Sequence, residues 1–233
     1  GSLVNLNRLD LYENQLSGNI PNVIGELVGL DYLALNDNQL NGELPSEFDN
    51  LLNLEYLDLS NNFLTGSIPP EFGGIDSLKT LFLQQNELTG EIPNELSSIE
   101  SLFSLNLSNN QLSGEIPATF GNLENLTTLD LSNNQLSGVI PLEIDDLINL
   151  TDLNIGENNL HGELRETLCN LNSSLIGNNF CPPYPTCFDY NNIFPQDCEN
   201  LICDDSSVGL WGWCLSLIHI SEPTRRYAIS YAV

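Results

Sequence analysis

Apolar and polar positions recur along this chain with a period of 24 residues. The clearest copy is Leu102 to Pro117, LFSLNLSNNQLSGEIP, and six more copies share its form, L-x-x-L-x-L-x-x-N-x-L-x-G-x-I-P. A fixed period of this length predicts a solenoid, in which each repeat forms one coil and packs only against its neighbours. We therefore expect seven coils between residues 6 and 167.

Each part of the repeat predicts a local structure. The alternation in Leu105-Asn106-Leu107 predicts a short strand with the leucines pointing inward and the asparagine pointing outward. Ser113-Gly114 then predicts a bend, because glycine tolerates unusual backbone angles. After the proline, apolar residues three apart, such as Phe48 and Leu51, predict a short 3-10 or helical turn on the convex side.

One asparagine in each coil keeps the 24-residue spacing without a slip. Its side chain is expected to turn inward, where the amide can bond to backbone groups of the adjacent coil that have no strand partner. We interpret these residues as a structural ladder rather than as a binding site: Asn14, Asn38, Asn62, Asn86, Asn110, Asn134 and Asn158.

These motifs resemble the plant-type leucine-rich repeat, whose consensus carries L-x-G-x-I-P, and the resemblance covers roughly Gly1 to Cys198. It implies an α/β repeat fold, a right-handed leucine-rich-repeat solenoid with a parallel β-sheet on the concave face and short 3-10 or helical turns on the convex face. It also implies recognition of a protein, peptide or glycan, as in receptor ectodomains and secreted polygalacturonase inhibitors.

The repeat phase predicts five segments. Residues 1–5 match the tail of a preceding repeat, and residues 6–167 form the seven repeats. Residues 168–203 resemble a shortened repeat followed by a cysteine-rich C-terminal cap, and residues 204–214 resemble the start of a further N-terminal cap through WGWC. Residues 215–233 have no repeat phase and contain SLIHISEPTR, which resembles a translated sequencing adapter, so we expect an artefactual or disordered tail.

The chain is strongly acidic, with 32 Asp and Glu residues against 5 Lys and Arg residues. Nucleic acid and anionic membrane surfaces both require clustered basic residues, so neither is expected as a partner. We interpret the acidic positions as a solvated outer face, which is typical of an extracellular protein.

All six cysteines lie in the final third of the chain, where the repeats stop. An even number there predicts a disulfide-bonded end cap and an oxidising, extracellular compartment. Cys169, Cys181, Cys187 and Cys198 are expected to form two bridges, with the pairing left open, and Cys203 can pair with Cys214. Zinc is the alternative, but the spacings lack C-x-x-C, so no metal and no cofactor is expected.

The sequence gives little support for catalysis. A nucleophilic triad needs a histidine beside Ser or Cys, yet His161 lies in a predicted bend. Asp10 and Asp58 share an outward column two strands apart, about 10 Å, which is at or beyond the upper limit for an inverting glycosidase. We therefore expect a protein that is not an enzyme.

Aromatic residues gather on the outward positions of the first four predicted strands, while strands five to seven carry small polar residues. Exposed aromatics with an arginine are typical of interface centres. We predict a ligand-binding surface formed by Arg8, Asp10, Tyr12, Tyr32, Asn36, Tyr56, Asp58, Phe82 and Gln84. The alternative is that tyrosine simply suits strand surfaces, in which case the acidic solenoid is a structural or adhesive matrix or cell-wall protein.

Four N-x-S/T sequons predict N-glycans if the chain is secreted: Asn106, Asn125, Asn149 and Asn172. Asn106 lies in an outward column of the concave face, where a glycan would block that half of the surface. This position agrees with a ligand nearer to the N-terminus.

Overall fold

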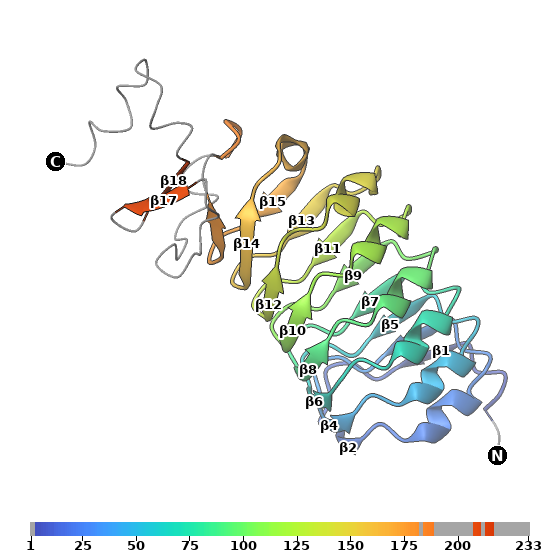
Figure 1. The fold of residues 1–233 in the computed structure, drawn as a ribbon. Helices are drawn as coiled ribbons and strands as arrows, with labels where there is room; N and C mark the ends of the chain where they lie inside the picture. Colours follow the sequence, from blue (N-terminus) through green and yellow to red (C-terminus); the bar gives the residue numbers. More distant parts are fainter. Residues whose placement is uncertain (1–2, 182–183, 189–206, 211–212, 217–233) are drawn as a thin grey trace.

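The computed structural model describes residues 3–181, 184–188, 207–210 and 213–216. Residues 3–181 form a right-handed solenoid of stacked coils (Figure 1). Each complete coil contains one strand of a first sheet, one strand of a second sheet and a 3-10 turn, in that order along the chain. The predicted leucine-rich-repeat solenoid is thereby confirmed.

The first sheet covers the concave face, and we call it the concave sheet. Its eight strands are parallel and pair in chain order, so that Tyr32 lies between Arg8 and Tyr56 in register. The 24-residue period thus places equivalent residues side by side on neighbouring strands. The strands are β1 (Arg8–Asp10), β3 (Tyr32–Ala34), β5 (Tyr56–Asp58), β7 (Thr80–Phe82), β9 (Ser104–Asn106), β11 (Thr128–Asp130), β13 (Asp152–Asn154) and β15 (Asn172–Ser174).

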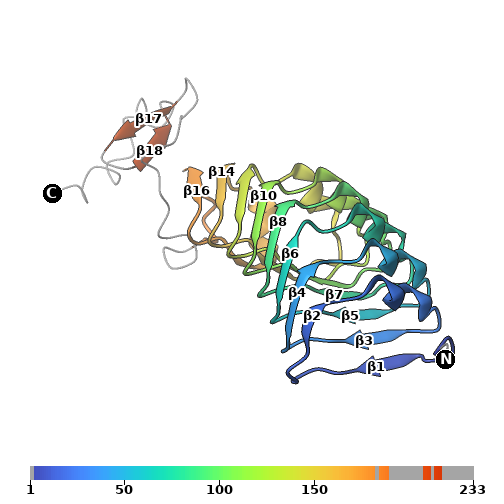
Figure 2. The same ribbon diagram turned by 90° about the horizontal axis from the view of Figure 1, so that it is seen from below.

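A second parallel sheet, which the sequence analysis did not predict, runs along another side of the solenoid (Figure 2). The expected bend at Ser113-Gly114 is wrong, because both residues lie within a strand of this sheet. Gly114 has a φ of 81°, a backbone conformation that favours glycine. A Cβ atom on this residue would lie only 2.8 Å from Glu91 Cγ, so glycine also allows the neighbouring strands to pack closely. The strands are β2 (Ser17–Asn19), β4 (Gln39–Glu43), β6 (Phe63–Gly66), β8 (Glu87–Glu91), β10 (Gln111–Glu115), β12 (Gln135–Gly138), β14 (Asn159–Glu163) and β16 (Asn179–Cys181).

Short 3-10 turns cover the convex face. Six of them begin directly after a proline, whose fixed φ suits entry into a turn, and the seventh begins after Arg165. One large apolar residue of each turn points inward, as Phe48 and Phe72 show with ring centroids 5.4 Å apart. The turns are η1 (Asn22–Glu26), η2 (Ser46–Asn50), η3 (Pro70–Gly74), η4 (Asn94–Ser98), η5 (Ala118–Asn122), η6 (Leu142–Asp146) and η7 (Glu166–Asn170).

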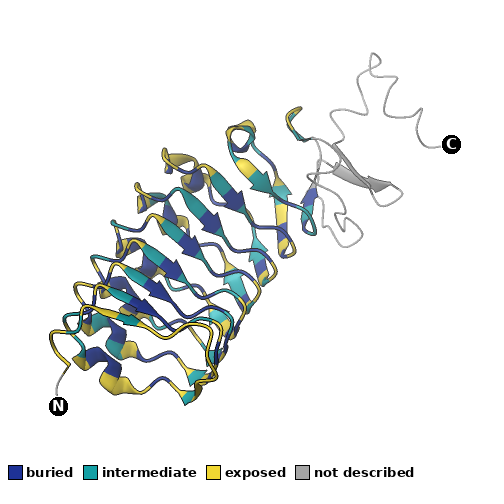
Figure 3. Ribbon diagram, turned by 180° about the vertical axis from the view of Figure 1, so that it is seen from behind, coloured by how far each residue is buried: buried dark blue, intermediate teal, exposed yellow. Residues whose placement is uncertain are grey.

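A continuous apolar core fills the solenoid between the two sheets and the turns. Buried positions recur at the same place in every coil after the first (Figure 3). Leu57, Leu81 and Leu105, on adjacent strands, have no exposed surface. Each such leucine contributes about 1.5–3 kcal/mol, so the coils stabilise one another by covering each other's leucines.

The repeated asparagines lie inside the solenoid and connect adjacent coils. Asn86 Nδ2 donates to the carbonyl oxygens of Leu59 and Leu83 at 3.0 and 3.1 Å, and its Oδ1 accepts from the backbone N–H of Leu64 at 3.0 Å. Leu59 and Leu83 directly follow β5 and β7, whereas Leu64 lies in β6, so this side chain connects the two sheets as well as adjacent coils. Asn178 makes the same contacts in the shortened eighth coil.

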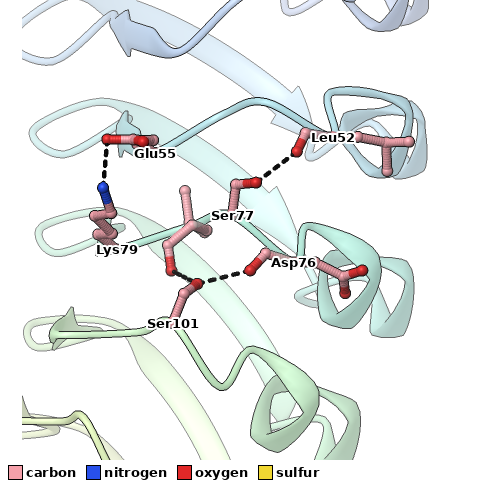
Figure 4. A network of polar contacts seen from close by, with 7 residues as sticks. Leu52, Glu55, Asp76, Ser77, Lys79 and Ser101 are labelled. Atoms are coloured by element: carbon pink, nitrogen blue, oxygen red, sulfur yellow. Dashed lines mark hydrogen bonds and ion pairs between the residues drawn. The ribbon is translucent and has the colours of Figure 1, made fainter.

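A second polar ladder, also absent from the sequence analysis, connects the coils just before each concave strand (Figure 4). Ser77 Oγ donates to the carbonyl oxygen of Leu52 at 2.7 Å, and Ser101 Oγ donates to that of Asp76 at 2.7 Å. Asparagines make this contact in other coils: Asn53, Asn125 and Asn149. The sequence signal was a serine or asparagine directly before the first leucine of the strand segment in the third to seventh coils, whereas the second coil has Gly29 there.

Arg165 connects the seventh coil to the sixth, in place of the usual proline. Its guanidinium forms two hydrogen bonds to the carboxylate of Asp145, at 2.9 and 3.1 Å, and donates to the carbonyl oxygens of Ile140 and Pro141. Four bonds from one side chain hold this end of the solenoid together. The repeat therefore continues where its consensus fades.

The described C-terminal residues contain one disulfide, between Cys169 of η7 and Cys187. This bridge fits the predicted end cap. Cys198 and Cys203 lie outside the described residues, as do the side chains of Cys181 and Cys214, so the other bridges stay predictions.

Beyond the cap, β17 (Ser207–Leu210) and β18 (Trp213–Ser216) pair antiparallel. The first two residues of the predicted tail lie in β18, and residues 217–233 lie outside the described part. The proposed domain boundaries stay predictions.

Candidate functional site

Four side chains from consecutive strands of the concave sheet stack against one another, and we call Arg8, Tyr32, Tyr56 and Phe82 the aromatic row. Arg8 Cζ lies 3.5 Å from the centroid of the Tyr32 ring. The Tyr32 and Tyr56 rings are parallel, with centroids 4.4 Å apart, and Phe82 meets Tyr56 edge to face at 6.0 Å. The parallel register of β1, β3 and β5 places Arg8, Tyr32 and Tyr56 side by side. Phe82 is instead the register partner of Asp58, so its ring meets Tyr56 from the next outward column.

The faces of the two tyrosine rings are covered within the row. Their centroid distance of 4.4 Å is close to the spacing of about 4.8 Å between strands, so the rings stand on edge and face along the solenoid axis. Arg8 covers one face of Tyr32, and Tyr56 covers the other. A ligand on the concave face therefore meets ring edges and phenolic oxygens rather than open ring faces.

Two carboxylates fix the row from the next outward column. Arg8 forms an ion pair with Asp10 at 2.8 Å, and the hydroxyl of Tyr56 donates to Asp58 at 3.2 Å. Asp58 is only 7% exposed, and its other oxygen accepts from the N–H and Oγ of Ser60 at 3.0 and 2.6 Å. Burial of the phenol and the nearby Asp58 carboxylate raise the pKa of Tyr56 well above its ordinary value.

The other predicted site residues lie around the row. Tyr12 follows β1 and is 49% exposed. Asn36 donates to Asp37 at 2.7 Å. Gln84 is half-buried after β7, and its Oε1 has no hydrogen-bond partner. The structure therefore brings all nine predicted residues to the first four coils, although Asp58 holds Tyr56 in place and exposes little surface of its own.

The concave face changes character after the fourth coil. Ser104 and Thr128 replace the tyrosines, and Asp130 accepts from the N–H and Oγ of Ser132 at 3.0 and 2.7 Å. Hydrogen bonds from Thr151 and Asn172 lower the pKa of Asp152 in the seventh coil. The carboxylates of Asp130 and Asp152 are occupied by local bonds, so this half offers a polar surface without the aromatic stack.

Within the described residues, every lysine and arginine is paired with a carboxylate. Besides Arg8, Lys79 Nζ contacts Glu55 Oε2 at 2.7 Å (Figure 4), and Arg165 contacts Asp145. In contrast, the carboxylates of Glu13 and Asp31 are exposed and make no side-chain bond. The row is therefore surrounded by net negative charge.

The four sequon asparagines occupy different surfaces. Asn106 lies on the concave sheet and accepts from the N–H of Ser108 at 3.0 Å. Asn125 and Asn149 belong to the second polar ladder on adjacent coils, and Asn172 donates to Asp152 at 2.7 Å. Three of them are exposed, and Asn106 is half-buried.

The carboxylate pair considered for catalysis is not arranged for acid–base chemistry. Asp10 is neutralised by Arg8, and Asp58 lies buried beneath its partners. His161 lies in β14 of the second sheet. Among the residues that the structure describes, no three histidine, cysteine or acidic side chains converge into a possible metal site.

The family follows from the repeats and from a direct comparison. A family model described as "Leucine-rich repeat region" matches residues 2–175. The chain belongs to the leucine-rich repeat family. Leucine-rich-repeat regions are non-catalytic binding modules, which confirms the expectation for the matched residues 2–175.

Solved leucine-rich-repeat structures are similar to this chain. The ectodomain of the Arabidopsis thaliana receptor kinase GASSHO1/SCHENGEN3, in complex with CASPARIAN STRIP INTEGRITY FACTOR 2, is 40% identical over 78% of this chain and 22% of its own, with a TM-score of 0.73. The ectodomain of the Arabidopsis receptor kinase HAESA, in complex with an extended IDA peptide hormone, is 38% identical over 78% of this chain and 31% of its own, with a TM-score of 0.75.

A plant ice-binding protein is 32% identical over 78% of this chain and 67% of its own, with a TM-score of 0.65. The chain thus spans less than a third of the length of the two receptor ectodomains. No curated protein sequence matches it significantly. In the described residues, no helix has the length and apolar character needed to cross a bilayer.

Proposed function

We propose that this chain is the ligand-recognition part of an extracellular receptor-like protein, and that it binds a peptide or protein segment along the aromatic row. The single observation that carries the proposal is the stack of Arg8, Tyr32, Tyr56 and Phe82 across four adjacent strands. Rigid aromatics beside an arginine are the residues that dominate binding energy at protein interfaces. The similar receptor ectodomains were solved in complex with a peptide hormone or a named factor, which supports this class of ligand.

The geometry of the row favours a peptide over a glycan. A sugar ring binds an aromatic residue by lying on its face, but the faces of Tyr32 are covered by Arg8 and Tyr56. A peptide can instead bond to the phenolic oxygens and pack its apolar side chains against the ring edges and Phe82. The concave sheet, with its parallel strands, also suits an extended segment that crosses several strands.

The proposal is tested by selecting displayed random linear peptides on the purified chain. A peptide that binds the wild type should lose binding at least tenfold to the Tyr32→Ser/Tyr56→Ser variant. The matched control is Ser104→Ala/Thr128→Ala, which changes the equivalent positions of the fifth and sixth coils and should leave affinity unchanged. Circular dichroism of both variants confirms folding. Equal binding by wild type and the tyrosine variant would reject the row as the site.

A second candidate function is adsorption to a solid surface such as ice. It is a specific form of the alternative that the solenoid acts as a structural or adhesive protein. The observation that favours it is the similarity to the plant ice-binding protein, of which this chain covers 67%. The second sheet supplies a regular surface, with one short hydroxyl side chain in each of the third to sixth coils, at Thr65, Thr89, Ser113 and Ser137. The test is ice-growth inhibition by the wild-type chain, with Thr65→Lys/Thr89→Lys as the variant that should lose it. A wild type without effect on ice growth rejects this candidate.

A further inference from the structure

The positive charges of the described solenoid are already used within the protein. Arg8, Lys79 and Arg165 contact Asp10, Glu55 and Asp145 at 2.8, 2.7 and 2.9 Å. A carboxylate, sulfate or phosphate on a ligand would therefore have to compete with a protein carboxylate for each of these three cations. An acidic ligand also has to approach a chain whose formal net charge is −27.

One carboxylate oxygen beside the row has no hydrogen-bond partner. The hydroxyl of Tyr56 is used within the row, since it donates to Asp58 and also bonds with Tyr32. Asp10 uses one carboxylate oxygen for Arg8, and its other oxygen makes no bond. A ligand N–H donor can bond to this oxygen.

Two unpaired carboxylates lie on opposite sides of the row. Asp31 directly precedes β3 and its Tyr32, and Glu13 follows β1 beyond Tyr12. Both side chains are exposed and unpaired, so each keeps its full charge for a partner. The aromatic row therefore lies between two negative groups.

We infer that the ligand of the aromatic row is a cationic peptide segment, whose arginine or lysine side chains contact Glu13 and Asp31 while its apolar residues pack against the ring edges and Phe82. This inference rests on the proposed function, because it names the chemistry of the ligand at the same site. The cationic groups supply N–H donors for these carboxylates, and the acidic surface increases the rate of encounter.

The experiment uses the displayed peptide library and the full chain. Peptides are selected on the wild type and depleted on the Tyr32→Ser/Tyr56→Ser variant, so that only those which need the row remain. The retained pool should be enriched in arginine and lysine, and depleted in aspartate and glutamate, relative to the starting library. Individual peptides from this pool then serve as probes for affinity measurements.

A matched pair of variants separates local contacts from the overall charge. Glu13→Gln/Asp31→Asn removes the two carboxylates beside the row and should weaken binding about tenfold. Glu71→Gln/Glu95→Gln removes the same charge from exposed positions of η3 and η4 on the convex face and should change affinity less than twofold.

The outcomes separate this inference from the proposed function. Retained peptides that are neutral or acidic overturn the cationic ligand but leave the aromatic row as the binding site. Equal losses in the two charge variants also overturn it, because the preference for cations would then reflect overall charge. A selection that retains no peptide rejects the proposed function, and the cationic ligand is rejected with it.

Discussion

The hydroxyl of Tyr56 donates to the carboxylate of Asp58, two residues further along the same strand, at 3.2 Å. Asp58 is itself held by the backbone and hydroxyl of Ser60. The Tyr56 ring is therefore fixed by its strand and by Tyr32 before any ligand arrives. A preorganised ring loses little conformational freedom on binding, which favours affinity.

The raised pKa of Tyr56 predicts a loss of stability at alkaline pH. Because the folded chain holds this proton more tightly, the stabilisation is fully present below the ordinary tyrosine pKa of about 10 and is lost as the pH rises above it. The free energy of unfolding of the wild type should therefore fall relative to Tyr56→Phe above about pH 10. Chemical denaturation of both proteins between pH 8 and about pH 11 measures this difference. A difference that does not change over this range contradicts the prediction.

Replacement of Asn86 by alanine should destabilise the solenoid by about 3 kcal/mol, because several buried backbone groups lose their partner. Asn14→Ala is the matched control. Asn14 bonds only to the carbonyl oxygens of Leu11 and Tyr12 in its own coil and is exposed, so its loss should cost less than about 1 kcal/mol. Urea denaturation of both variants gives the comparison, and equal effects would contradict the role of the inner ladder.

The sequence predicted the features of the fold that depend on period, and missed those that depend on how one coil meets the next. The 24-residue spacing placed Leu105 and Asn110 correctly, because inward leucines recur in every coil. It did not predict the second sheet, because Ser113-Gly114 resembles a bend until the neighbouring coil supplies a strand partner.

The same limit applies to the candidate site. The outward columns located Tyr32 and Tyr56 on adjacent strands. The covering of the Tyr32 ring faces by Arg8 and Tyr56, and the burial of Asp58, depend on side-chain rotamers that the sequence does not reveal. The pairing of Lys79 with Glu55 also became visible only in three dimensions, because the two residues are 24 positions apart in the sequence.

The contact between Asp145 and Arg165 should stabilise the seventh coil at neutral pH and lose this effect in acid. Desolvation alone would raise its pKa, but hydrogen bonds from Arg165 and Thr167 outweigh this effect and lower the pKa below its ordinary value. The stabilisation is therefore present above the unfolded pKa of about 3.9 and is lost as the pH falls through the lower folded value. Asp145→Asn should cost about 1–2 kcal/mol at pH 7 and progressively less below about pH 4.

Asp49→Asn is the control for this prediction. Asp49 occupies the equivalent position of η2 and forms no ion pair, so the substitution should have little effect at either pH. Equal effects of the two substitutions at pH 7 would show that the contact with Arg165 contributes nothing specific.

One residue before each inner asparagine adopts a left-handed backbone conformation, which the sequence analysis missed. At Gln85 the φ is 57°, whereas the consensus residue at this position is asparagine, which tolerates the left-handed region better. Gln85→Asn should therefore stabilise the chain by about 0.5 kcal/mol, measured by thermal or urea denaturation. Gln111→Asn, in strand β10, is the control and should give no gain.

The central claim is that the ligand lies across the first four strands of the concave sheet. Hydrogen–deuterium exchange with and without a selected peptide tests it most directly, since each coil gives separate fragments. The account predicts slower exchange around residues 8–13, 31–37, 56–60 and 80–85 on binding, and no change around residues 128–132 or 152–156. Protection confined to the later coils, to the second sheet or to the convex turns would contradict it.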